Sequence, residues 1–126
     1  MKKLTITLLP DIAGVCRLDR KTSFQEMPQP GCGFYSVTIT PDEISLVCRE
    51  EDIPADYPSE KPFRIFKVEG PLDFGLTGIL SALLKPLADA GIPVFTLSTY
   101  DTDYLMVRSE NLDRASSALS KVAVLK

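Results

Sequence analysis

The sequence contains no histidine among its 126 residues. This absence removes the commonest general base of enzymes, the catalytic triads that depend on it and most transition-metal sites. A P-loop, a dinucleotide-binding glycine motif and a nucleophile motif are missing too. One alternative stays open, a small enzyme that uses Asp101 and Asp103 as paired carboxylates, although both lie on one turn that we expect to be exposed. We therefore predict a protein that is not an enzyme and that holds no cofactor and no metal.

Basic clusters, long apolar runs and paired cysteines are missing as well. The net charge is −3 without any block of Lys and Arg, which argues against nucleic acid and against an anionic membrane surface as partners. No stretch reaches the roughly 18 apolar residues of a membrane span, and residues 4–9 predict a strand rather than a signal peptide. The three cysteines fit neither a disulfide framework nor a zinc site. We expect a cytoplasmic protein.

The composition is otherwise that of a globular protein, with 44% hydrophobic and 25% charged residues, and the chain repeats itself. A shift of 60 positions lays residues 34–38 on 94–98 and residues 43–47 on 103–107. The same shift lays the opening strand, residues 4–9, on residues 64–69. Because the register is kept across three strands, we predict an internal duplication.

The second copy, residues 63–126, predicts a complete βαββαβ unit. A strand at 63–69 precedes an amphipathic helix, whose apolar positions at three- and four-residue spacing are Leu76, Ile79, Leu80, Leu83, Leu84 and Leu87. We expect Asp73 to cap this helix, Gly91 to end it, and Pro86 to kink it or end it early. The remaining predicted elements are strands at 93–99 and 103–108, a helix from Glu110 and a strand at 122–125.

The first copy, residues 1–62, keeps the strands but has little room for helices. Pro10 and Asp11 form a turn signal after the opening strand, and residues 14–18 predict an extra strand. Prolines and glycines allow one helical turn at most in the first helix and shorten the second, and residues 56–62 predict a linker. We therefore predict an α+β fold of two ferredoxin-like units in tandem, with a boundary at about residue 62.

Two segments of the second copy resemble a known family. They are residues 69–80, Glu-Gly-Pro-Leu-Asp-Phe-Gly-Leu-Thr-Gly-Ile-Leu, and residues 97–107, Leu-Ser-Thr-Tyr-Asp-Thr-Asp-Tyr-Leu-Met-Val. The hairpin at residues 34–38 and 41–48 supports the match. The chain resembles the small bacterial tandem-ACT proteins related to the CASTOR arginine sensors.

This resemblance implies ACT units that pair side by side in dimers or larger assemblies, with an amino acid bound between a loop of one unit and a strand of its neighbour. It therefore implies a homodimer, a small-molecule ligand and a separate, regulated partner protein. The sensors are longer and carry more ACT units, so a site between distant units would need a second chain here. Matched motif to motif, the implied ligand-contacting positions are Gly70, Asp73, Leu76, Thr99, Tyr100 and Asp103, and the segments around them add Leu72, Ser98 and Asp101.

These residues have the chemistry that a free amino acid requires. Its carboxylate favours free backbone N–H groups at a helix start, and the loop at 70–75 leads into one. Its ammonium needs acceptors that Asp73, Asp101 or Asp103 supply. Each residue also has a purely structural interpretation, since Asp73 can be an N-cap, the aspartates at 101 and 103 an ordinary polar turn, and Tyr100 a cover for a sheet edge. The alternative function is therefore a structural or oligomerising ACT module without a ligand.

Overall fold

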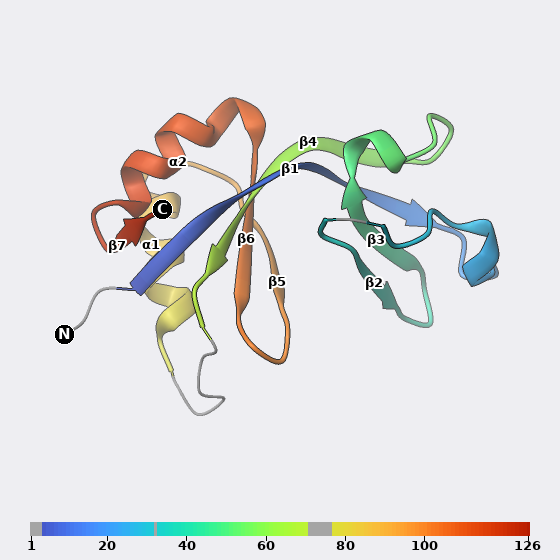
Figure 1. The fold of residues 1–126 in the computed structure, drawn as a ribbon, viewed down its shortest axis with the longest axis horizontal. Helices are drawn as coiled ribbons and strands as arrows, with labels where there is room; N and C mark the ends of the chain where they lie inside the picture. Colours follow the sequence, from blue (N-terminus) through green and yellow to red (C-terminus); the bar gives the residue numbers. More distant parts are fainter. Residues whose placement is uncertain (1–3, 32, 71–76) are drawn as a thin grey trace. The chain divides into compact units, whose positions relative to one another are not determined.

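The computed structural model describes residues 4–31, 33–70 and 77–126, and it divides into two compact units (Figure 1). We call Met1–Pro10 together with Arg64–Lys126 the α/β unit, and Asp11–Phe63 the β unit. The strands are β1 (Leu4–Leu18), β2 (Ser36–Ile39), β3 (Ile44–Arg49), β4 (Ser59–Val68), β5 (Phe95–Ser98), β6 (Asp103–Arg108) and β7 (Ala123–Leu125). The helices are α1 (Ile79–Asp89), α2 (Leu112–Leu119) and the 3-10 turns η1 (Phe24–Glu26), η2 (Glu50–Asp52) and η3 (Ser109–Asn111).

The described strands form one sheet in the order β2-β3-β1-β4-β6-β5, and β7 pairs with β1. The hairpins β2–β3 and β5–β6 are antiparallel, and so is the pairing of β1 with β3. The pairing of β1 with β7 is parallel and joins Leu4 to Ala123 and Ile6 to Leu125. Two strands, β1 and β4, contribute residues to both units. The prediction of an α+β fold with mainly antiparallel strands is confirmed.

The core of the α/β unit lies between its strands and both α-helices. Alternate residues of the strands, including Ile6, Phe66 and Leu105, are buried with Leu83 of α1 and Leu119 of α2 in one apolar cluster. Because side chains alternate between the faces of a strand, both helices cover the same face of the sheet. The element order from β4 to β7 is the predicted β-α-β-β-α-β.

Helix α1 matches the predicted apolar stripe but begins later than expected. Its N-cap is Gly78, with φ +79°, so Asp73 does not cap it; Asp73 and Leu76 lie outside the described residues. The expected early end at Pro86 is wrong, since the helix continues to Asp89 and buries Leu87 completely.

The C-terminal end of α1 is built as predicted. Gly91, with φ +72°, donates its N–H to Ala88 O at 2.9 Å, and Ile92 donates to Leu87 O at 3.0 Å. This pair of hydrogen bonds is a Schellman motif, which requires a left-handed residue that glycine adopts without strain. The motif holds the last turn together in spite of the N–H that Pro86 lacks.

The β unit contains strands and single 3-10 turns in its described residues, so its predicted short helices are shorter still. Its apolar cluster includes Cys16, Leu46, Cys48 and Ile53, with Tyr35 packed against them. In the described residues of this unit, η1 and η2 stand where the sequence predicted short helices.

The two hairpins of the structure correspond to each other at a shift of 59 residues, so the predicted shift of 60 is one residue out. Strands β2 and β5 begin at Ser36 and Phe95, and 95 − 36 = 59; β3 and β6 begin at Ile44 and Asp103, and 103 − 44 = 59. The pairing registers of the two hairpins and the starts of η2 and η3 agree with the same shift. A one-residue slip exchanges the two faces of a strand, so 59 is the shift that keeps buried residues on buried residues.

The turn expected at Pro10 and Asp11 does not form, and residues 14–18 are not a separate strand. Instead, β1 runs without a break from Leu4 to Leu18. Pro10 lies between the stretch of β1 that pairs with β7 and the stretch that pairs with β3, where a missing N–H breaks neither of these ladders. The predicted linker at 56–62 is wrong in its second half, because β4 already begins at Ser59.

The backbone at Gly33 provides a first testable prediction. Gly33 has φ +100°, and a Cβ there would lie 2.5 Å from Asp11 Oδ2, whereas a Cβ at Gly78, with φ +79°, would meet nothing within 4 Å. We expect Gly78→Ala to lower the free energy of unfolding by about 1–2 kcal/mol through backbone strain alone. Gly33→Ala should lower the free energy of unfolding clearly more, because the Asp11 carboxylate must also move away from the new methyl group. Urea unfolding measures both losses. Equal losses in the two variants would contradict the close approach of Asp11.

Candidate functional site

The predicted site falls on two segments of the α/β unit, the end of β4 and the turn between β5 and β6. Gly70 is exposed and follows the last residues of β4, while Leu72, Asp73 and Leu76 lie outside the described residues. The hairpin residues Ser98, Thr99, Tyr100, Asp101 and Asp103 surround the turn that joins β5 to β6. The structure therefore describes one side of the predicted site and the first residue of the other.

The turn between β5 and β6 is closed by its own hydrogen bonds. Thr99 N–H donates to Thr102 O at 2.8 Å, the Thr99 hydroxyl donates to the same oxygen at 3.2 Å, and Thr102 N–H donates to Thr99 Oγ1 at 3.4 Å. The first hairpin makes the same three bonds between Thr40 and Glu43, at 3.0, 3.4 and 3.2 Å. The turn geometry is therefore a property of the repeat, as expected for a Thr that bonds to its own turn backbone.

Thr102 connects this turn to the end of β4, and the sequence did not single it out. It is the one buried polar residue in the part of the chain that the structure describes, with 4% of its surface exposed. Its hydroxyl donates to Val68 O, the carbonyl of the last residue of β4, at 2.5 Å. The hydrogen bond links the turn between β5 and β6 to the end of β4, two residues before Gly70. In the sequence, the one sign of this role is that Thr102 is a β-branched hydroxyl residue next to Tyr100 and Asp101, whose side chains are aromatic and acidic.

The acidic and aromatic side chains of the turn point to solvent or to the turn itself. Tyr100 is 84% exposed, and Asp101 is exposed as well. Asp103 Oδ1 accepts a hydrogen bond from the Ser98 hydroxyl at 2.5 Å across the first pair of the hairpin. The prediction that Tyr100 covers a sheet edge is not supported by this exposure. Asp103 has one carboxylate oxygen engaged in the hairpin.

Glu69, directly after β4, carries a further carboxylate and is not among the predicted site residues. Glu69 Oε1 accepts a hydrogen bond from the Thr7 hydroxyl of β1 at 2.6 Å, and Oε2 lies 4.0 Å from the Lys67 ammonium. Its side chain is 41% exposed, so the ion pair with Lys67 contributes little to stability. The hydroxyl of Thr7 fixes one oxygen of the carboxylate next to Gly70.

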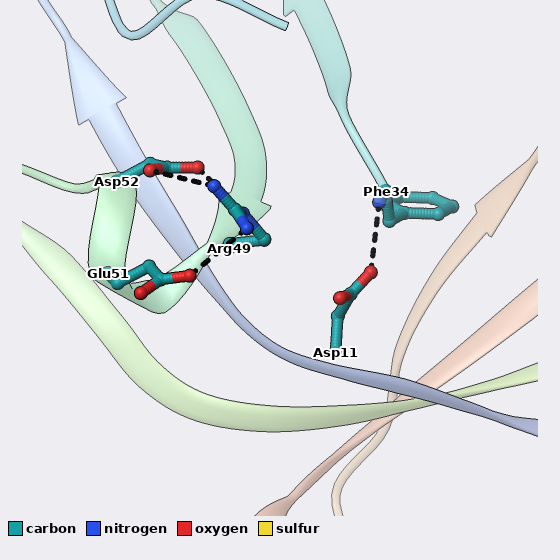
Figure 2. Close-up of polar contacts among 5 residues, drawn as sticks. All are labelled: Asp11, Phe34, Arg49, Glu51 and Asp52. Carbon is teal, nitrogen blue, oxygen red and sulfur yellow. Dashed lines mark hydrogen bonds and ion pairs between the residues drawn. The ribbon is translucent and has the colours of Figure 1, made fainter. Parts of the chain in front are cut away.

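Two further sets of polar contacts lie in the β unit, one around Arg49 at η2 and one between Asp11 and the chain before β2 (Figure 2). Arg49 Nε donates to Asp52 Oδ2 at 3.0 Å, and an Arg49 terminal nitrogen lies 3.1 Å from Glu51 Oε1. The hydrogen bond to Asp52 and the two negative charges raise the pKa of the Arg49 guanidinium above its ordinary value. Asp11 Oδ2 accepts the Phe34 N–H at 3.4 Å. Arg49 is thus paired with Asp52 and Glu51, and Asp11 is bonded to a backbone N–H, which indicates a structural role for these side chains.

A shallow hollow of about 370 Å³ lies on α2 and the end of α1, and none of the residues that line it is a predicted site residue. It is lined by Ala90, Asp113, Arg114, Ser117, Ala118 and Lys121. Arg114 donates to Ala90 O and, at 3.2 Å, to Asn111 Oδ1. The guanidinium therefore caps the C-terminal carbonyls of α1, which explains its position without a ligand.

Cys16 and Cys48 of the β unit are buried thiols. Cys16 and Cys48 lie on adjacent strands, where Gly14 is opposite Cys48 and Cys16 is opposite Leu46, and both are at most 2% exposed. Burial raises the pKa of both thiols, that of Cys48 to about 11. Such thiols are poor nucleophiles at neutral pH.

Within residues 4–31, 33–70 and 77–126, no group of three or more His, Cys, Asp or Glu side chains could hold a metal ion.

A family model described as the ACT domain matches residues 59–121, which is 63 of the 126 residues and thus half of the chain. The chain belongs to the ACT domain family. A second family model, described as an N-terminal domain, matches residues 11–56 of this ACT protein. Neither description names a catalytic activity. No helix in the described ranges is long and apolar enough to cross a membrane.

The resemblance to the CASTOR sensors is also confirmed. The ACT protein is 31% identical over 101 residues to the bovine cytosolic arginine sensor for mTORC1 subunit 1, a match that covers 71% of this chain and 31% of the sensor. The chain therefore spans about a third of the length of this relative.

Two solved structures share the fold. Protein Atu0741 from Agobacterium tumefaciens is 33% identical, with a TM-score of 0.90 over 100% of this chain and 94% of that one. The regulatory subunit of aspartate kinase from Thermus thermophilus has a TM-score of 0.58 at 11% identity, over 96% of this chain and 99% of that one. The second likeness is one of fold alone.

Proposed function

We propose that this ACT protein binds an amino acid where the end of β4 meets the turn between β5 and β6, and that it regulates a separate protein in the cytosol. The observation that carries the proposal is the hydrogen bond from Thr102 to Val68 O, because it links the predicted turn to the end of β4, two residues before Gly70. The similarity to a protein named as a cytosolic arginine sensor supports both the ligand class and the compartment.

The charges at this place favour an amino acid with a cationic side chain. Glu69, Asp101 and Asp103 bring three carboxylates to the two segments, against the single ammonium of Lys67. One carboxylate can accept the ligand ammonium and another a basic side chain, through charge-assisted hydrogen bonds. Gly70, Leu72, Asp73 and Leu76 are proposed to supply backbone contacts and the rest of the loop, and Ser98, Thr99 and Tyr100 the rim of the turn.

We further propose that the chain consists of two ACT-like repeats, residues 1–62 and 63–126, and that it forms a homodimer. The shared register of 59 between the hairpins supports the repeats, even though η1 and η2 are all that remains of the helices of the first. Light scattering tests the dimer, and a monomer mass at tens of micromolar protein would contradict it.

The proposed function is tested by a thermal-shift screen of the twenty amino acids, followed by calorimetry. A ligand at 100 times its Kd should stabilise the folded protein by roughly 2.7 kcal/mol. If no amino acid binds at millimolar concentration, the ligand-free structural module takes the place of this proposal. That alternative is favoured by the bond between Ser98 and Asp103, since it uses a proposed ligand group within the turn.

Asp103→Ala should weaken amino acid binding about ten- to a hundredfold, because it removes a charged hydrogen-bond partner of the ligand. The free energy of unfolding should change much less, since Asp103 lies at the edge of an exposed turn. A matched control is Asp42→Ala in the corresponding turn of the first repeat, where calorimetry should show unchanged affinity. Equal affinities for the wild type and Asp103→Ala would contradict the role of this carboxylate.

A further inference from the structure

The two hairpin turns of the repeat allow a comparison within one chain. Both turns close with the same three hydrogen bonds, made by Thr99 in one turn and by Thr40 in the other. The two turns differ in the residue that follows the tip. This residue is Thr102 in the second turn and Glu43 in the first, two positions that correspond at the shift of 59. A turn of this type therefore forms without a buried hydroxyl at that position.

Since the turn does not need the Thr102 side chain, the hydroxyl has another effect, which is to hold the turn against β4. Thr102 donates to Val68 O at 2.5 Å and is buried, whereas its counterpart Glu43 is half-buried and no such bond of its side chain is present in the described structure. The next residue after Val68 is Glu69, whose N–H donates to Thr5 O at 2.8 Å and whose carboxylate is held by Thr7. One hydroxyl thus links the turn to Val68, which lies next to Glu69 and two residues before Gly70.

We infer that Thr102 is the positioning residue of the proposed ligand site, fixing the carboxylates of the β5–β6 turn relative to Glu69 and Gly70. This inference rests on the proposed function for its ligand, but the fixing itself is a property of the free protein. A buried hydrogen bond between two short segments limits their relative movement, and a site held in place loses less entropy when a ligand binds. The Thr102 hydroxyl does not itself touch the ligand.

The experiment compares Thr102→Val, which keeps the shape but removes the donor, with Thr102→Ser, which keeps the donor. In the free protein, amide hydrogen exchange at Glu69, Thr99, Asp103 and residue 102 should be about tenfold faster in Thr102→Val than in wild type, and close to wild type in Thr102→Ser. Glu43→Ala is the matched control and should leave these four amides unchanged. Urea unfolding of each variant separates a local effect from a general loss of stability.

The second measurement is calorimetry with L-arginine as the probe. Thr102→Val should bind about tenfold more weakly than wild type, and Thr102→Ser should recover most of the affinity. Unchanged exchange at the four amides, or exchange equally fast in Thr102→Val and Thr102→Ser, would overturn the inference. So would wild-type affinity in Thr102→Val. If wild type binds no amino acid, the proposed function fails, and the exchange data alone decide whether Thr102 fixes the turn to β4.

Discussion

Phe66→Ala is expected to lower the free energy of unfolding by about 3–5 kcal/mol, as measured by urea unfolding followed by circular dichroism. Phe66 lies near the end of β4, is 1% exposed, and packs in the core of the α/β unit with residues of α1, α2 and the neighbouring strands. The loss combines the transfer of a large apolar side chain with the cavity that it leaves.

Phe24→Ala is the matched control, because it removes the same atoms from a side chain that is 50% exposed in η1. It should cost about 1 kcal/mol or less. Should Phe66→Ala be too unstable to purify, Phe66→Leu is expected to lose about 1–2 kcal/mol and to remain folded. A loss below 1 kcal/mol for Phe66→Ala, with an unchanged urea dependence, would contradict the position of Phe66 in the core.

Alkaline pH is expected to destabilise the protein through its buried thiols. Burial raises the pKa of Cys48 from the ordinary value of 9.0 to about 11, and it raises the pKa of Cys16 in the same direction. Between these values the unfolded chain has lost the thiol proton while the folded protein keeps it. Stability is therefore complete below pH 9 and falls as the pH rises towards 11, by about 1.4 kcal/mol for each pH unit and thus by about 3 kcal/mol from Cys48.

The measurement is the free energy of unfolding in urea at a series of pH values from 7 to 11, for wild type and for the double variant Cys16→Ala/Cys48→Ala. The variant should have a clearly shallower slope above pH 9, whatever its stability at neutral pH. The pKa of Tyr35 is raised by burial and further by the charges of Cys48 and Cys16, so the double variant also loses part of this contribution, which acts in the same direction. Identical slopes would show that neither thiol is as deeply buried as its neighbours in the β unit indicate.

The local features of this protein were predictable because they depend on residues close in the chain. The hairpins follow from alternating apolar residues around a Thr-containing turn, and the end of α1 follows from Gly91, which adopts the left-handed backbone that the Schellman motif needs. The ACT resemblance was equally local, since it depended on segments around residues 69–80 and 97–107. The register of the repeat was one residue out, because both shifts align apolar residues and only the pairing of the strands distinguishes them.

The sequence by itself thus determined the hairpins, the apolar stripe of α1, the presence of a helix after Glu110 and the order of elements from β4 onward. Only the tertiary structure decided that β1 continues through Pro10, because this depends on which partners, β7 and β3, lie along the strand on either side of the proline. It also decided that Thr102 and Glu69 belong beside the predicted site residues. Their hydrogen bonds go to Val68, 34 positions away, and to Thr7, 62 positions away, and such distant partners leave no periodic trace in the sequence.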